Sequence, residues 1–336
     1  MNESRLPPLI EARRISKDFT RLPDFAQRLA QQLRAVPVAP PVRAVDQVDL
    51  AITHGEVLGL VGESGCGKST LGRIIAGLLP LSSGKLFFEG VEQSHELATK
   101  AGSTRLQMQM VFQDPMSSLN PRQRVRDIIG EAPRVHGIIT QSEVDDYVSE
   151  LMLKVGLDPA YQQRYPHQFS GGQRQRVSIA RALAVKPRLL ICDEAVAALD
   201  VSIQAQVLNL FMDLKDAFKL TYLFISHDLG VVKHLADRVA IMYLGRIVEI
   251  APTEALFAEP NHPYAQALLA EVPQIGAGKR EYDVINGEIP SPLAPPSGCH
   301  FHPRCPHAMT RCSMEQPLLK EIAPMRFSAC HLNDRN

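Results

Sequence analysis

Apolar and polar positions along the chain predict strands that alternate with helices. Residues 1–19 have the apolar positions of an opening strand, and the alternation in 45–52 is typical of a half-buried strand. The short apolar run at 57–61 predicts a fully buried strand. Residues 20–43, which are rich in proline, are expected to form an irregular insertion.

Apolar residues with the spacing of a helix occur after the buried strand and again in the middle of the chain. Apolar residues recur with a helical period from residue 69 onward and through most of 124–185. Two further apolar runs, 189–192 and 222–225, predict buried parallel strands. A strand, a glycine-rich turn and a helix in this order predict an α/β fold.

Composition narrows the classes of function. Hydrophobic residues make up 45% of the 336 residues, and Lys+Arg equal Asp+Glu at 36 each, so the net charge is zero. A nucleic-acid partner usually requires a basic excess, so none is expected. We see neither a secretory signal nor a run of about 18 apolar residues that could cross a bilayer. We therefore expect a cytoplasmic protein that reaches a membrane only through a partner.

Residues 62–69 fit the pattern G-x-x-x-x-G-K-[ST] and are called the phosphate loop below. Its glycines let backbone N–H groups point at phosphate oxygens, Lys68 reaches the β- and γ-phosphates, and Ser69 can bind Mg²⁺. The alternative is a glycine-rich turn without a ligand, which the flanking strand and helix disfavour. The expected nucleotide contacts are Gly62, Ser64, Gly65, Cys66, Gly67, Lys68, Ser69 and Thr70.

Cys66 lies in this loop near a helix start, where a thiol pKa tends to fall. We therefore expect alkylation of Cys66 to inhibit the protein and ATP to protect it.

Two carboxylates end the apolar run 189–192. A buried parallel strand presents groups at its carboxyl end, so Asp193 is expected to hold Mg²⁺. Glu194 is expected to orient and partly deprotonate the attacking water. Two adjacent acids are often only a solvated turn, and the phosphate loop is what favours the catalytic interpretation.

A second anion site is predicted at residues 170–173, the signature segment, which precede a helix. The Ser170 hydroxyl and the N–H groups of Gly171 and Gly172 can bind an anion at a helix start, although a simple helix cap is the alternative. Two phosphate-binding helix starts in one chain suggest a nucleotide shared between two copies.

These residues resemble the ATP-binding cassette (ABC) family, in order, over the first 250 residues. The resemblance identifies Walker A at 62–70, the Q-loop at Gln113, the signature at Ser170, Gly171, Gly172 and Gln173, Walker B at 189–194, the D-loop at Asp200 and the switch histidine at His227. It implies a P-loop NTPase cassette with a RecA-like core, an antiparallel β edge and a helical subdomain. Glu194, His227 and Lys68 would be catalytic, and Ser69, Gln113 and Asp193 would hold Mg²⁺.

The same resemblance implies two cassettes that enclose two ATP molecules between Walker A of one and the signature of the other. Phe19 lies where an aromatic side chain usually stacks on adenine, and Phe25 is the competing candidate.

A closer resemblance, to the dipeptide and oligopeptide importer ATPases, covers nearly the full chain. It rests on 113–115, 119–121, 167–170, 261–264, 290–293 and the last four cysteines. It divides the chain into a nucleotide-binding domain, 1–255, with a helical subdomain at about 114–185, and a C-terminal extension, 256–336. It implies a second ATPase subunit in a heterodimer, two transmembrane permeases and an external solute-binding protein. The chain would lie peripherally on the cytoplasmic side of the inner membrane.

Four of the six cysteines lie in this extension: Cys299, Cys305, Cys312 and Cys330. Four thiolates can enclose a [4Fe–4S] cluster or a tetrahedral Zn²⁺, and nearby histidines keep zinc open. Free or disulfide-bonded cysteines are the third alternative. The subfamily resemblance favours the iron–sulfur cluster.

Two other functions share these motifs. A soluble ABC ATPase acting on ribosomes or DNA would usually carry two cassettes or long inserted arms, and the sequence has one Walker A and no such arm. Alternatively, the extension senses redox state or metal and gates the ATPase.

Overall fold

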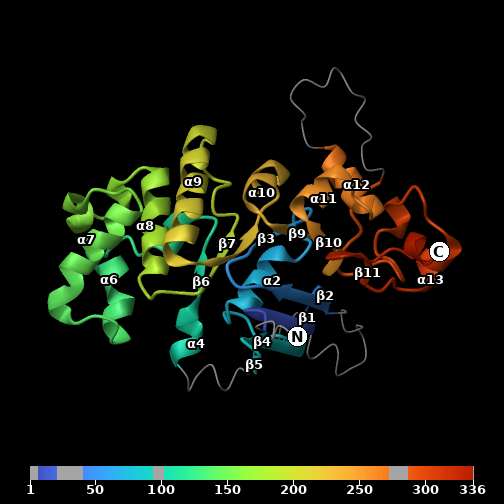
Figure 1. Cartoon of the computed structure of the whole chain (residues 1–336), viewed down its shortest axis with the longest axis horizontal. Helices are drawn as coiled ribbons and strands as arrows, with labels where there is room; N and C mark the ends of the chain where they lie inside the picture. The colour runs from blue at the N-terminus through green and yellow to red at the C-terminus, as the bar shows by residue number, and fades with distance from the viewer. Residues whose placement is uncertain (1–6, 21–40, 94–101, 272–286, 336) are drawn as a thin grey trace, which may run out of the picture.

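The computed structural model describes residues 7–20, 41–93, 102–271 and 287–335 of the chain. The proline-rich insertion expected at 20–43 falls almost wholly outside these ranges, and Phe25 does too. The helical subdomain and the C-terminal extension lie at opposite ends of the longest axis, with the sheets between them (Figure 1). No helix in the described ranges is both long and apolar enough to span a bilayer.

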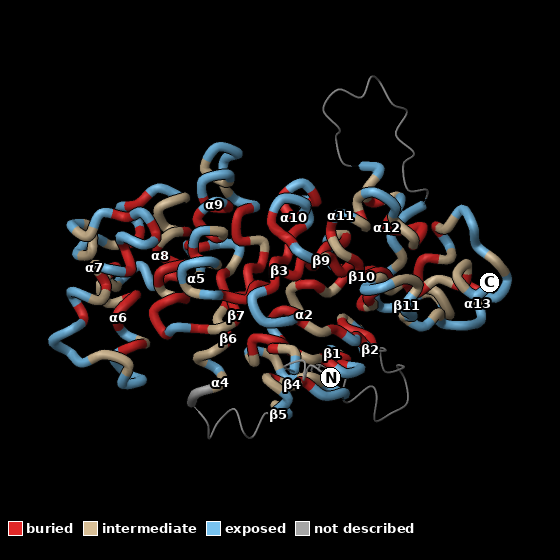
Figure 2. Tube along the Cα trace, in the orientation of Figure 1, coloured by how far each residue is buried: buried red, intermediate tan, exposed pale blue. Residues whose placement is uncertain are grey.

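A mixed sheet of eight described strands forms the centre of the molecule. Its order is β11-β12-β10-β9-β3-β8-β7-β6, and the strands from β9 to β6 are parallel. β3, β7 and β8 are buried along their whole length, as their uninterrupted apolar runs predict. Figure 2 shows β3 and β7 in the colour of buried residues. The strands are β3 (Val57–Val61), β6 (Met108–Val111), β7 (Leu189–Asp193), β8 (Thr221–Ile225), β9 (Arg238–Tyr243), β10 (Arg246–Pro252), β11 (Lys320–Ala323) and β12 (Arg326–Ser328).

A smaller antiparallel sheet, of order β2-β1-β4-β5, packs over one face of the central sheet. Its strands are β1 (Ile10–Phe19), β2 (Val42–Ile52), β4 (Ser83–Phe88) and β5 (Val91–Glu92). Helix α2 (Lys68–Ile75) contacts β2 as well as β7 and β8. Its buried Leu71 and Ile74 share a core with Ile15 of β1 and Leu60 of β3. The phosphate loop, which joins β3 to α2, is therefore anchored at both ends by this core.

Residues 114–185 form mostly helices, as predicted. The helices are α5 (Pro115–Ser118), α6 (Val125–Val135), α7 (Val144–Lys154) and α8 (Gly171–Leu183), with short 3₁₀ turns η1 (Gln141–Glu143), η2 (Pro159–Gln163) and η3 (Pro166–Gln168). α8 packs against β6 and against α9 (Val201–Phe218), so the subdomain is joined to the β6 edge of the sheet. The other helices described before residue 260 are α4 (Gly102–Gln107), α10 (Leu229–Leu235) and α11 (Thr253–Ala258).

The C-terminal extension continues the sheet and the core of the preceding residues. β12 pairs antiparallel with β10, where Phe327 lies opposite Ile250. The ring of Phe301 is buried against Tyr243 and Tyr264. The described elements of the extension are α12 (Pro263–Ala270), η4 (His302–Arg304), α13 (Thr310–Met314), β11, β12 and η5 (His331–Arg335). The division of the chain at 255/256 remains a prediction.

Candidate functional site

The phosphate loop is wedged between two backbone segments. A Cβ on Gly62 would lie 2.1 Å from the carbonyl oxygen of Met242, and a Cβ on Gly67 would lie 2.1 Å from that of Ala44. Gly67 has φ 110°, a conformation that residues with a side chain rarely adopt. Glycine is therefore required at both positions for the loop to fit against β9 and β2.

Lys68 begins α2 and lies under the loop. Its side chain is only 4% exposed, and its ammonium donates to the carbonyl oxygens of Gly62 (2.8 Å) and Glu63 (3.0 Å). Ser64 and Gly65 are exposed at the crest of the loop, and Thr70 is half-buried in α2. A positive side chain, a helix start and a curled backbone thus meet at one point, which is the arrangement that binds phosphate.

The side chains of Ser69 and Asp193, two of the three residues expected to hold Mg²⁺, are in contact. The Ser69 hydroxyl donates to Oδ1 of Asp193 at 2.7 Å, across the gap between α2 and the end of β7. Burial raises the pKa of Asp193, and the hydrogen bond from Ser69 and the charges of Arg73 and Lys68 oppose that shift. Gln113 is exposed just beyond β6, the strand next to β7. The oxygens of this set are ligands of the kind that Mg²⁺ prefers.

Glu194 and His227 lie together at the same edge of the sheet. Oε1 of Glu194 is 3.4 Å from Nδ1 of His227, which follows β8. Glu194 has φ 48°, and its N–H donates to the carbonyl oxygen of Ile225 at 3.0 Å. A non-glycine residue held in the left-handed region is uncommon and is often found at functional sites.

The signature segment forms a helix cap at the start of α8. The Ser170 hydroxyl accepts from the N–H of Gln173 (3.4 Å), and the Ser170 N–H donates to Oε1 of Gln173 (3.0 Å). Gly171 is exposed at the helix start. α8 packs on β6, whereas α2 packs on β2, β7 and β8 (Figure 1). The capping box is the simple helix cap that the sequence left as an alternative, and the anion site at this segment remains a prediction. Asp200 is exposed at the start of α9.

Phe19 ends β1 opposite Val42 and is 41% exposed. The Lys17 ammonium lies 5.4 Å from the centroid of its ring. Val42 leads along β2 to Ala44, which contacts the phosphate loop. An exposed aromatic ring near the loop is compatible with adenine stacking, and that role remains a prediction.

Comparison with known proteins decides the family. The ABC transporter family model matches residues 45–197, and the model for the C-terminal region of oligopeptide/dipeptide transporters matches residues 248–312. The oligopeptide transport ATP-binding protein AppF of Bacillus subtilis is 52% identical over 87% of this chain and 90% of its own length. The di/tripeptide transport ATP-binding protein DppF of Pseudomonas aeruginosa is 47% identical over 86% of this chain and 90% of its own length.

This chain belongs to the ATP-binding subunits of ABC transporters. It is therefore an ATPase of that family, as the motifs predicted. Two solved cassettes share its fold at 24% identity. CbiO1 from Clostridium perfringens has a TM-score of 0.61 over 75% of this chain, and a dimeric cassette bound to ADP and Pi has 0.60 over 73%.

The four cysteines of the extension of this ABC subunit line one small cavity of about 20 Å³, together with His262 and His302. All four thiols are free. Burial and, to a smaller degree, the other three thiols raise the pKa of Cys330 to about 11. A cation bound at this cavity would favour the charged thiolate form of these cysteines. However, no three His, Cys, Asp or Glu side chains in the described ranges are arranged as a metal-binding group.

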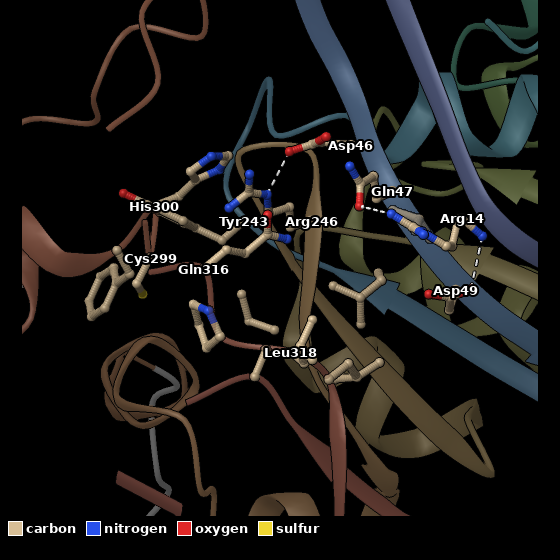
Figure 3. Close-up of a pocket in the computed structure, with 17 residues that line it drawn as sticks. Arg14, Asp46, Gln47, Asp49, Tyr243, Arg246, Cys299, His300, Gln316 and Leu318 are labelled. Atoms are coloured by element: carbon tan, nitrogen blue, oxygen red, sulfur yellow. Dashed lines mark hydrogen bonds and ion pairs between the residues drawn. The ribbon is translucent and has the colours of Figure 1, made fainter. Parts of the chain in front are cut away.

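A larger cavity of about 330 Å³ lies between the small sheet, the β9–β10 hairpin and the extension (Figure 3). Its charged lining is mostly paired internally: Nε of Arg246 is 2.6 Å from Asp46, and the Arg14 guanidinium donates to Gln47 at 2.8 Å. It contains none of the residues predicted to bind nucleotide.

One contact to the phosphate loop has no counterpart in the sequence analysis. Arg304 of the extension forms an ion pair with Glu63, at 3.0 Å from each guanidinium nitrogen to a carboxylate oxygen. No sequence pattern links two residues so far apart. The only available signals are an acidic residue inside a phosphate loop and an arginine beside Cys305.

The prediction that the pKa of the Cys66 thiol falls is wrong, whereas inhibition by alkylation stays a prediction. Cys66 is 4% exposed, and burial raises the pKa of its thiol, which the Lys68 ammonium opposes only in part. The groups at the helix start do act to lower the pKa of this thiol, but burial of the sulfur outweighs them.

We expect iodoacetamide to modify Cys66 at least about tenfold more slowly in the folded chain than in urea, because the thiolate is scarce and covered. Labelling over time, followed by peptide mass spectrometry, measures both rates. Fast modification of folded protein that ATP prevents would contradict the effect of burial.

Proposed function

We propose that this chain energises an ABC importer for di- and oligopeptides or related small solutes. The observation that carries the proposal is the meeting of Ser69 with Asp193 and of Glu194 with His227 beside one phosphate loop. The names of AppF and DppF, which refer to oligopeptide and di/tripeptide transport, support the cargo class. The matched transporter C-terminal region at 248–312 supports it independently.

In the proposed reaction, loop N–H groups and Lys68 hold the ATP phosphates. Ser69, Asp193 and Gln113 would hold Mg²⁺, which would neutralise charge on the phosphates. Glu194 accepts a proton from the attacking water, and His227, within 3.4 Å of Glu194, contacts the γ-phosphate. Phe19 is proposed to stack on adenine.

The signature segment is proposed to complete the site of a second cassette. Gly171 at the start of α8 is exposed, and α8 packs on β6 and α9, whereas α2 packs on β2, β7 and β8. Ser170, Gly171, Gly172 and Gln173 would contact ATP held by the partner subunit, and Asp200 would lie at the same junction. We propose that the pair is a heterodimer.

ATP binding would close the pair, and the exposed region around Gln113 would transmit closure to two permeases. Hydrolysis leaves like-charged products together and favours reopening. The chain would act peripherally at the cytoplasmic face of the inner membrane, with an external solute-binding protein supplying the cargo.

Replacing Glu194 by Gln is expected to lower ATPase turnover about a hundredfold or more while ATP still binds, because the general base is lost. Phosphate release and equilibrium nucleotide binding measure the two effects. Glu150→Gln, which removes an exposed carboxylate on α7, is the matched control and should keep full turnover. Normal turnover in Glu194→Gln would remove Glu194 from its role.

Purification of the chain from its own membranes in mild detergent tests the transporter assignment. We expect a second cassette ATPase and two multi-span membrane proteins to co-purify. Ribosomal or DNA-repair proteins instead, with the chain wholly in the soluble fraction, would favour the alternative of a soluble ABC ATPase.

We further propose that Cys299, Cys305, Cys312 and Cys330 hold a [4Fe–4S] cluster with a structural role. The convergence of their side chains on one cavity supports this, and zinc remains the alternative.

Anaerobically purified protein is expected to contain about four iron and four sulfide per chain, and Cys312→Ala is expected to lose both. Cys192→Ala, which removes a cysteine outside the cavity, should keep them. Zinc without sulfide would support the alternative, and protein without either metal would contradict both.

A further inference from the structure

The C-terminal extension contacts the phosphate loop through the side chains of Arg304 and Tyr264. Nη1 and Nη2 of Arg304 each lie 3.0 Å from a different carboxylate oxygen of Glu63, the second residue of the loop. We propose that Arg304 is a positioning residue for ATP binding, which holds the phosphate loop and neutralises the carboxylate within it. The proposal rests on the phosphate loop being the nucleotide site.

The pair is held on several sides. Arg304 is 8% exposed, and its Nη1 also donates to the Tyr243 hydroxyl at 3.2 Å. The Glu63 N–H donates to the hydroxyl of Tyr264 at 3.0 Å. The rings of Tyr243, Tyr264 and Phe301 pack together, with centroids 4.6 to 5.4 Å apart. Both the side chain and the backbone of Glu63 are thus fixed by groups that belong to, or pack on, the extension.

The part of the phosphate loop around Cys66 is also supported by the extension, through the turn between β9 and β10. The Gly245 N–H donates to the Cys66 carbonyl oxygen at 2.8 Å. The carbonyl oxygen of the preceding residue, Leu244, lies 3.0 Å from Nδ1 of His300. Arg246 donates to the Gly298 carbonyl oxygen at 3.0 Å and pairs with Asp46 (Figure 3). The β9–β10 turn is therefore held between the loop and the extension.

Charge explains why the pair matters for nucleotide binding. A carboxylate in a phosphate loop repels phosphate unless a cation compensates it. Two like charges about 10 Å apart near a protein surface change an equilibrium constant by roughly tenfold. A bidentate guanidinium both cancels that charge and fixes its direction. Because a buried ion pair often adds little net stability, its main effect is expected on loop geometry and affinity.

Titration of purified full-length chain with ADP tests the role of Arg304. Arg304→Gln is expected to raise the Kd about tenfold, since Glu63 is left uncompensated. Adding Glu63→Gln to Arg304→Gln should recover most of that loss, whereas Arg304→Lys should lose less because the charge is kept. Recovery on removal of the second partner is a double-mutant signature that general loss of stability does not give.

Arg238→Gln is the matched control. Arg238 forms a similarly covered pair with Glu56, at the opposite end of β3 from the loop. Its variant should lower the melting temperature while leaving the Kd for ADP unchanged.

An unchanged Kd in Arg304→Gln, or additive losses in the double variant, would overturn the proposal and leave the ATPase assignment intact. A wild-type chain that binds no ADP would contradict both the proposed role of Arg304 and the ATPase assignment.

Discussion

The fit of the phosphate loop against its neighbours is the constraint on which the rest of the site depends. Gly62 and Gly67 pass so close to the carbonyl oxygens of Met242 and Ala44 that a methyl group would collide with backbone. Backbone cannot move aside as a flexible side chain can, so the loop is fixed relative to both sheets. Lys68, which starts α2, is fixed with it. Anything that shifts β9 or β2 therefore shifts the position where phosphate would bind.

The packing of the parallel strands brings the predicted catalytic and metal-binding side chains to the edge of the sheet beside the phosphate loop. β7 and β8 are covered on both faces, so polar groups can follow only at their ends, and parallel neighbours end on the same edge. Asp193, Glu194 and His227 are gathered in this way beside Ser69. The left-handed backbone of Glu194 adds a local bend that the surrounding hydrogen bonds maintain.

The extension belongs to the same packed unit as the phosphate loop. β12 adds to the edge of the central sheet, and Phe301 is buried among aromatic side chains beneath the loop. Cys305, which lines the cysteine cavity, directly follows Arg304 in the sequence. A change that loosens the extension would therefore also disturb the residues that hold the phosphate loop.

The sequence by itself determined the order of strands and helices, the phosphate loop and the acidic strand end, because these depend on local periodicity and on residues adjacent in the chain. It also pointed to the family, which the comparisons confirmed. Only the tertiary structure decided which groups are buried and which distant residues meet. Burial reversed the expected pKa shift of Cys66, and packing brought Arg304 to Glu63 across most of the chain. Both outcomes depend on what surrounds a side chain in three dimensions, and neither periodicity nor spacing encodes that.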